Sequence, residues 1–173
     1  MIVVVAGVSG SGKTTVGSLL ASTLGWPFTD GDGMHPAANI AKMRAGLPLS
    51  DEDRRPWLAA IAARMDDYLA AGRSAVLACS ALKRSYRDML SSGRPGVSIV
   101  FLEVSRDVLA ARLRARHGHF FPAALLDSQL AAVEVPQPAE RALVVTAASQ
   151  PDQTVAEIIR RLRLPPREGK MTS

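Results

Sequence analysis

Four short stretches of the chain are almost purely apolar and rich in β-branched side chains. They span residues 2–6, 75–79, 97–104 and 142–146, and a weaker stretch of the same kind lies at 26–29. Uninterrupted apolar runs of this length are typical of parallel strands that are covered on both faces. The pattern therefore predicts five strands in one parallel sheet.

The segments between these strands carry apolar residues at the spacing of amphipathic helices. The clearest stripes lie at 16–24, 58–69 and 155–162. We expect Asp51 to cap the second of these helices and Gly72 to end it. Because strands alternate with helices, we predict an α/β fold in three layers, with helices on both faces of the sheet.

The charge balance narrows the classes of partner. The 173 residues carry a formal net charge of +5, with 17 arginines against 4 lysines. An arginine pairs bidentately with phosphate and carboxylate groups, so this excess suits an enzyme that holds two anions as well as a nucleic-acid binder. The basic residues form no long run, and aromatic residues make up only 5% of the chain, which disfavours stacking on bases. We therefore expect small anionic ligands and no nucleic-acid partner.

Three further features point to the cytoplasm. Cys79 is the single cysteine, which excludes an intrachain disulfide and fits a reducing compartment. We interpret it as a buried apolar residue rather than a nucleophile. No apolar run reaches the roughly 18–20 residues that a membrane span needs. Met1 leads directly into an apolar strand without a basic segment, so we predict no signal peptide.

A glycine-rich loop follows the first predicted strand. Residues 7–14 read G-V-S-G-S-G-K-T, which matches the Walker A pattern G-x-x-x-x-G-K-[ST]. Glycines let main-chain N–H groups turn toward a phosphate, and the helix N-terminus that follows favours anions. Lys13 can then reach the β- and γ-phosphates of ATP, and the Thr14 hydroxyl can bind Mg²⁺. The residues expected to bind ATP here are Gly7, Val8, Ser9, Gly10, Ser11, Gly12, Lys13, Thr14 and Thr15.

Two carboxylates follow the weak second strand. Asp30 and Asp32 are separated by a flexible glycine, and no Asp directly follows the third strand, where most P-loop ATPases carry a metal-binding acid. The carboxyl ends of strands in an open α/β sheet face the ligand crevice. One carboxylate can hold a water of Mg²⁺ while the other accepts a proton from a substrate hydroxyl. A solvated acidic turn is the alternative.

Three basic residues are candidates for binding an anionic group of the substrate. They are Arg54, Lys83 and Arg87. Lys83 and Arg87 stand four residues apart on a predicted helix, and the repulsion between them favours an anion in the space they share. Arg54 could instead pair with Asp51 or Asp53.

Several longer blocks resemble a known family. Residues 30–43 are similar to D-G-D-x-x-H-P-x-x-N-I-x-K-M, residues 51–58 to D-x-D-R-x-P-W-L, and residues 79–88 to C-S-A-L-K-x-x-Y-R-D. An arginine-rich segment ending in G-H-F-F at 118–121 looks like a lid, and a Ser-Gln pair at 128–129 follows in the expected order. Over roughly residues 4–160 the chain resembles the gluconokinase family of P-loop small-molecule kinases, which are related to shikimate and adenylate kinases.

The resemblance implies transfer of the γ-phosphoryl group of ATP to the C6 hydroxyl of D-gluconate, with Mg²⁺ as cofactor. It implies one kinase domain over 1–164, with substrate-binding helices at about 33–72, a lid at about 112–124 and a flexible tail at 165–173. Family members are often dimers, so the resemblance also implies a homodimer.

We expect Asp32 to deprotonate the substrate hydroxyl and Asp30 to support Mg²⁺ through water, although the two carboxylates could exchange roles. Lys13 and Arg116 complete the expected catalytic set. As lid arginines, Arg112 and Arg116 are expected to bind ATP and neutralise charge in the transition state. The residues that the resemblance adds for substrate binding are His35, Asn39 and Lys42.

Two other functions stay open. A related kinase for shikimate or another sugar acid is the nearer one, although Cys79-Ser80-Ala81 replaces the glycine triplet of shikimate kinases. An ATP-binding regulatory or RNA-binding module is the other, and it predicts nucleic-acid binding that weakens steeply with salt.

Overall fold

The computed structural model describes residues 1–115, 123–140, 142–147 and 150–165. Arg116, the G-H-F-F segment expected in the lid and all of the expected tail except Pro165 lie outside these residues. The helices and strands follow the order β1 (Ile2–Ala6), α1 (Lys13–Leu24), β2 (Phe28–Asp30), η1 (Gly31–Met34), α2 (Ala37–Arg44), α3 (Asp51–Ala70), β3 (Ala75–Ala78), α4 (Arg84–Ser91), β4 (Val97–Glu103), α5 (Arg106–Ala115), α6 (Ala123–Ala131), η2 (Pro138–Glu140), β5 (Leu143–Thr146) and α7 (Pro151–Leu162).

The five strands form one parallel sheet in the order β2-β3-β1-β4-β5. β1 lies at the centre, and each of its residues is 0% exposed. This arrangement confirms the predicted five-stranded parallel sheet. The predicted strands differ from the observed ones only by one or two residues at their ends.

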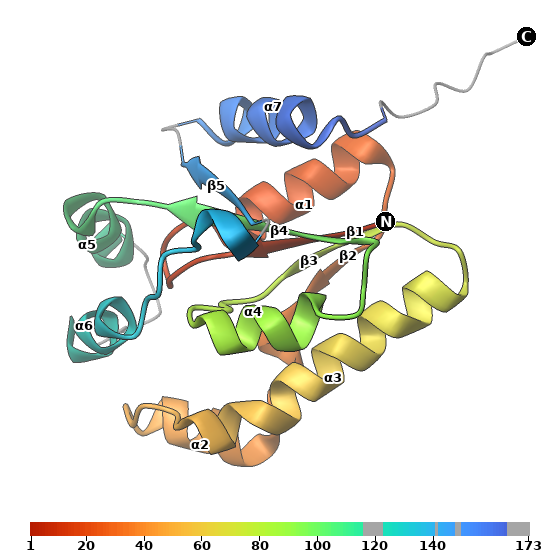
Figure 1. Ribbon diagram of the computed structural model, residues 1–173. Helices are drawn as coiled ribbons and strands as arrows, with labels where there is room; N and C mark the ends of the chain where they lie inside the picture. The colour runs from red at the N-terminus through yellow and green to blue at the C-terminus, as the bar shows by residue number, and fades with distance from the viewer. Residues whose placement is uncertain (116–122, 141, 148–149, 166–173) are drawn as a thin grey trace, which may run out of the picture.

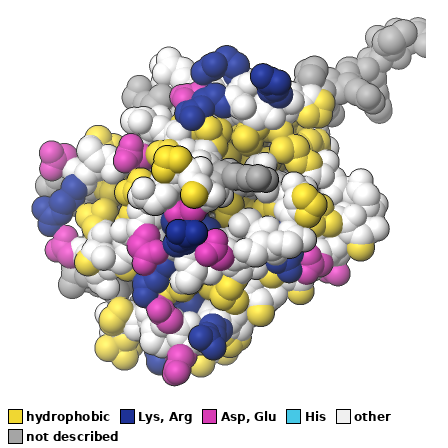
Figure 2. All heavy atoms as spheres, in the orientation of Figure 1, with side chains coloured by type: hydrophobic (Ala, Val, Ile, Leu, Met, Phe, Trp, Pro, Cys, Tyr) yellow, Lys and Arg dark blue, Asp and Glu magenta, His cyan; other side chains and the backbone are white. Residues whose placement is uncertain are grey.

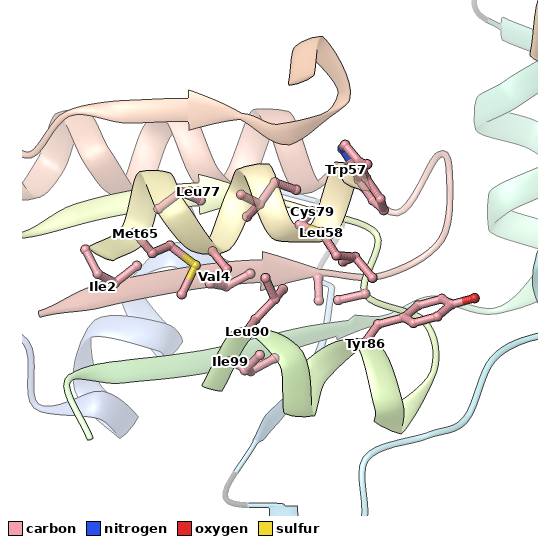
Figure 3. Packing of buried hydrophobic residues seen from close by; sticks show 14 of the residues in the cluster. Ile2, Val4, Trp57, Leu58, Met65, Leu77, Cys79, Tyr86, Leu90 and Ile99 are labelled. Carbon is pink, nitrogen blue, oxygen red and sulfur yellow. The ribbon is translucent and has the colours of Figure 1, made fainter. Parts of the chain in front are cut away.

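Helices cover both faces of the sheet, as Figure 1 shows: α1 and α7 lie on one face, and α3 and α4 lie on the other. The side chains of β1 alternate between two cores. Val3 and Val5 pack under α1 and α7, whereas Ile2 and Val4 pack under α3 and α4. Figure 3 shows the second core, whose labelled members include Trp57, Leu58, Met65, Leu77, Leu90 and Ile99. The sheet is thereby fixed between two apolar layers and holds the carboxyl ends of its strands in place.

The predicted N-cap of α3 is wrong, and the predicted stop of the helix is confirmed. The N-cap is Ser50 and not Asp51, because the Ser50 hydroxyl accepts from the Asp53 N–H at 3.1 Å while the Asp53 carboxylate accepts from the Ser50 N–H at 2.8 Å. This reciprocal capping box satisfies two main-chain donors at once. At the other end Gly72 has φ 64° and donates its N–H to the Leu69 oxygen, which confirms it as the helix stop.

The surface of the described residues has two relevant properties. No helix among them is both long and apolar enough to cross a bilayer. On the face that Figure 2 shows, Lys and Arg side chains lie beside Asp and Glu side chains, so their charges partly cancel there.

Candidate active site

The phosphate loop joins the end of β1 to the start of α1. Gly7 has φ 141° and Gly12 has φ 97°, which lie in the region that favours glycine. A Cβ at Gly7 would also lie 2.9 Å from the main-chain oxygen of Leu102 on β4. Lys13 is 8% exposed and folds back over the loop, where its Nζ donates to the Val8 oxygen at 3.0 Å. The loop therefore has the tight, glycine-dependent course that the Walker A pattern predicts.

The acidic residues after β2 lie beside the start of α1. Thr14 Oγ1 donates to Asp30 Oδ2 at 2.9 Å, and Asp30 Oδ1 accepts from the Asp32 N–H at 3.0 Å. The hydroxyl hydrogen of Thr14 is thus directed to Asp30, and its oxygen lone pairs are left for a metal ion. Hydroxyl and carboxylate oxygens are the ligands that Mg²⁺ prefers, so these residues fit the expected cofactor. Within the described ranges no group of three or more His, Cys, Asp or Glu could hold a metal alone, so phosphate oxygens and water would have to complete the shell.

Gly31, between the two carboxylates, is tightly packed. A Cβ there would lie 2.5 Å from the main-chain oxygen of Ala78 and 3.0 Å from Ile61 Cδ1. Its own oxygen accepts from Trp57 Nε1 at 2.7 Å. The sequence suggested a flexible glycine, but close approach to β3 is the physical reason that this residue has no side chain.

An aromatic pair forms a wall next to Asp32. The rings of His35 and Trp57 stack with their centroids 4.1 Å apart and 13° between their planes. Behind them, the buried Asn39 places its Nδ2 3.3 Å from His35 Nδ1 and donates to the Asp53 oxygen at 2.8 Å. Burial lowers the pKa of His35, and the charge of Asp32 opposes this in part. His35 is therefore neutral at pH 7, with Nδ1 as an acceptor and Nε2 left as a donor.

Lys42 lies near the end of α2 and is already paired. Its Nζ lies 2.7 Å and 2.9 Å from the two carboxylate oxygens of Asp53. Hydrogen bonds from Lys42, and then from the Ser50 N–H, lower the pKa of Asp53 to about 2. The pair connects α2 to the start of α3, so a substrate would meet Lys42 as a neutralised cation.

A second group of polar side chains joins the start of α3 to the loop before α4. Lys83 Nζ lies 2.8 Å from both oxygens of Asp51, and the Tyr86 hydroxyl donates to the same carboxylate. The hydrogen bond from Lys83, followed by that from Tyr86, lowers the pKa of Asp51. Arg54 donates to the main-chain oxygen of Leu49, and its guanidinium carbon lies 5.8 Å from the centroid of the Tyr86 ring. Among the described residues Arg54 has no carboxylate partner, which distinguishes it from Lys83.

Arg87 does not reach the expected site. Its side chain is 2% exposed, and its Nε donates at 2.7 Å to Glu140, whose side chain is 4% exposed. Its Nη1 also donates to the Leu82 oxygen at 2.9 Å. The expectation that Lys83 and Arg87 share one anion is therefore wrong, because Asp51 neutralises the first and Glu140 neutralises the second.

Helices α5 and α6 lie beyond the carboxyl ends of the strands (Figure 1), and one side chain from each helix contacts the phosphate loop. Arg112 Nη1 on α5 donates to the Ser11 oxygen at 3.2 Å and approaches the Gly10 oxygen at 3.5 Å. Gln129 on α6 accepts from the Ser9 N–H at 2.8 Å and donates to Ser9 Oγ at 3.1 Å. Arg112 is thus near the loop, as expected. Gln129 had no expected role, and its place in the Ser-Gln block was the only signal for it.

Cys79, directly after β3, is fully buried in the core that Figure 3 shows. Removal of the thiol from water raises its pKa to about 12. A thiolate is the nucleophilic form of cysteine, so this side chain contributes packing and no nucleophile at neutral pH.

Comparison with known proteins agrees with this geometry. A family model described as an AAA domain matches residues 2–136. The gluconokinase of Gluconobacter oxydans (strain 621H) is 50% identical over 157 residues, which cover 91% of this chain and 88% of the relative. An unliganded sugar kinase from Janibacter sp. HTCC2649 has a crystal structure with a TM-score of 0.89 at 44% identity, covering 95% of both chains. A gluconokinase structure from Sinorhizobium meliloti 1021 has a TM-score of 0.80 at 45% identity, covering 93% of this chain and 94% of that one. The chain belongs to the gluconokinase family of P-loop kinases.

Proposed function

We propose that this protein transfers the γ-phosphoryl group of ATP to the C6 hydroxyl of D-gluconate, with Mg²⁺, to give 6-phospho-D-gluconate and ADP. The observation that carries the proposal is the series of contacts from Thr14 to Asp30 to Asp32 beside the phosphate loop. Two consecutive hydrogen bonds join a hydroxyl suited to a metal ion, a carboxylate and the main chain of the candidate base, which supports these roles. The 50% identity to a protein named gluconokinase supports the choice of acceptor.

The reaction needs positioning and charge neutralisation more than covalent help from the protein. Main-chain N–H groups of the phosphate loop would hold the β- and γ-phosphates, and Lys13 and Arg112 would add positive charge. Mg²⁺, when bound, would neutralise further charge on the phosphate oxygens. Asp32 would accept the proton of the acceptor hydroxyl as its oxygen bonds to the γ-phosphorus, and ADP leaves as the bond to the β-phosphate oxygen breaks.

The acceptor needs a cation for its carboxylate and hydrogen-bond partners for its hydroxyls. Arg54 is the proposed carboxylate ligand, because the described residues give it main-chain oxygens and an aromatic ring as partners but no acid. The neutral His35 offers an Nε2–H donor for a hydroxyl. Asn39 acts through His35 by fixing its ring, while Lys42 and Lys83, both already paired, are secondary candidates.

ADP release from ATP and Mg²⁺ tests the reaction and the acceptor together. The panel contains gluconate, other aldonates, shikimate, nucleoside monophosphates and no acceptor. Fast release with gluconate alone is the expected result. ADP release with a different acceptor would contradict the proposed substrate. If the protein binds ATP but no acceptor increases ADP release, the proposed reaction would be contradicted.

Asp32→Asn tests the proposed base. Loss of a general base costs about 10²–10⁴ in rate, so kcat should fall by that factor while Tm stays near that of the unmodified protein. Asp67→Asn, which changes an exposed carboxylate on α3, is the matched control and should leave kcat unchanged. Turnover of Asp32→Asn within about threefold of the control would exclude Asp32 as the base and leave Asp30 as the candidate.

The proposal extends to a homodimer in the cytoplasm that binds gluconate and ATP and binds neither nucleic acid nor membranes. Resemblance to family members supports the dimer, and sedimentation equilibrium would test it.

A further inference from the structure

Gln129 makes a two-point contact with the phosphate loop across 120 residues of sequence. Its Oε1 accepts from the Ser9 N–H at 2.8 Å, and its Nε2 donates to Ser9 Oγ at 3.1 Å. Both residues are half-buried. The contact therefore joins α6 to the loop through both polar groups of one serine.

The chemistry of this contact selects a carboxamide. A carboxamide carries an acceptor oxygen and a donor nitrogen as two separate atoms of one neutral group, so it can pair with the N–H and the hydroxyl of Ser9 at once. A carboxylate could accept from the same N–H, but it would place a negative charge beside a loop that receives phosphates. Gln129 thus satisfies Ser9 without opposing the ligand that the loop is built to bind.

A small apolar core supports the same arrangement independently. Val8, next to Ser9 in the loop, is 5% exposed and packs with Leu109 of α5 and Leu126 of α6, which are 0% and 5% exposed. Leu126 and Gln129 are three residues apart, so they lie on one face of α6. That face therefore gives the loop one apolar anchor and one polar anchor.

We propose that Gln129 is a positioning residue for the phosphate loop, which it holds in its phosphate-receiving shape before ATP arrives. This inference rests on the proposed ATP-dependent function. A loop that is already ordered in the folded protein loses little further conformational entropy when ATP binds. The contact should therefore lower the Kd for ATP. Because Gln129 touches Ser9, and the proposed acceptor residues Arg54 and His35 make their contacts elsewhere, acceptor binding should not depend on it.

The test is a double-mutant cycle on Gln129 and Ser9, with ATP affinity measured directly by calorimetry in the absence of any acceptor. Gln129→Leu removes both hydrogen bonds at similar size and should raise the Kd for ATP about tenfold. Ser9→Ala removes one of the two and should raise it about threefold. The double variant should match Gln129→Leu and not the product of the two effects, because the Ser9 hydroxyl has then already lost its partner.

Two controls separate positioning from general loss of structure. Ser128→Ala changes the exposed neighbour of Gln129 on α6 and should leave the Kd unchanged. The KM for gluconate should stay within about twofold in Gln129→Leu, whereas a merely destabilised protein would lose Tm with an unaltered Kd. If Gln129→Leu does not fold, Gln129→Glu keeps the size and one acceptor, and it should weaken ATP binding more at low salt than at high salt.

Because ATP binding is read without an acceptor, the outcome is independent of whether gluconate is the substrate. An unchanged Kd in Gln129→Leu, a multiplicative double variant or a change confined to the KM for gluconate would each overturn the inference. A tenfold rise in Kd with non-additive coupling to Ser9 would establish it.

Discussion

A single methyl group at Gly31 provides a sharp test of how the acidic residues are held in place. In Gly31→Ala the new Cβ would lie 2.5 Å from the Ala78 oxygen and 3.0 Å from Ile61 Cδ1. The Ala78 oxygen belongs to β3, which is paired on one side with β1 and on the other with β2, so it cannot move away easily. Overpacking of this kind costs about 1–3 kcal/mol. At about 2–4 °C per kcal/mol for a chain of this size, Tm should fall by about 2–12 °C.

The same substitution should reduce turnover beyond its effect on stability. Gly31 joins Asp30 to Asp32, and its oxygen accepts from Trp57 Nε1, so relief of the clash would displace both carboxylates and the aromatic wall. A displacement of about 1 Å in reacting groups can cost about 10² in rate. Thermal melting and gluconate-dependent ADP release, both measured well below Tm, separate the two effects.

Gly33→Ala is the matched control, because a Cβ there would meet nothing within 4 Å. It should melt at the same temperature as the unmodified protein or slightly above it, since an alanine restricts the unfolded chain. If Gly31→Ala melted and turned over like Gly33→Ala, close packing against β3 would not be what holds the carboxylates in place.

Three further predictions concern stability and reactivity. Because burial raises the pKa of Cys79 to about 12, iodoacetamide at about pH 8 should label it only after unfolding, and fast labelling of the native protein would contradict its burial. The pKa of Asp53 lies at about 2, below its ordinary value, so its contribution is present above about pH 4 and is lost as the pH falls toward 2. Asp53→Asn should therefore flatten the acid side of a Tm-against-pH curve. Glu140→Gln leaves the buried Arg87 charge without its acid, and urea unfolding should show a loss of about 3–5 kcal/mol with an unchanged KM for gluconate. If Glu140→Gln had normal stability and a raised KM for gluconate, Arg87 would again be a candidate for substrate binding.

The parts of the site that could be predicted from sequence are those that depend on neighbouring residues or on sheet topology. The Walker A pattern is local, and its glycines have the φ values that such a loop requires. The approach of Asp30 to Thr14 was foreseeable because strands of a parallel sheet end on one edge, where the loop after β1 also lies. The five strands could be predicted because each apolar run is a local pattern of neighbouring residues.

The parts that could not be predicted depend on partners far away in the sequence. Arg87 looked available because its acid, Glu140, lies 53 residues further on in a short turn without periodicity. Gln129 lies 120 residues from Ser9, and no pattern within α6 marks the face that it shares with Leu126. The predicted N-cap of α3 was wrong by one residue. Ser50 and Asp51 are both good capping residues, and only the geometry of the turn decides between them.

The position of β1 has a consequence for how the chain is made. Its five apolar residues precede both of their partner strands in the chain, because Ile2 pairs with Ala75 on one side and with Val97 on the other. At ordinary synthesis rates of about 5–20 residues per second, several seconds pass before the second partner exists. During that interval the future centre of the sheet is an exposed apolar segment on the ribosome. Among the described strands, the one that carries the phosphate loop therefore waits longest for its second partner.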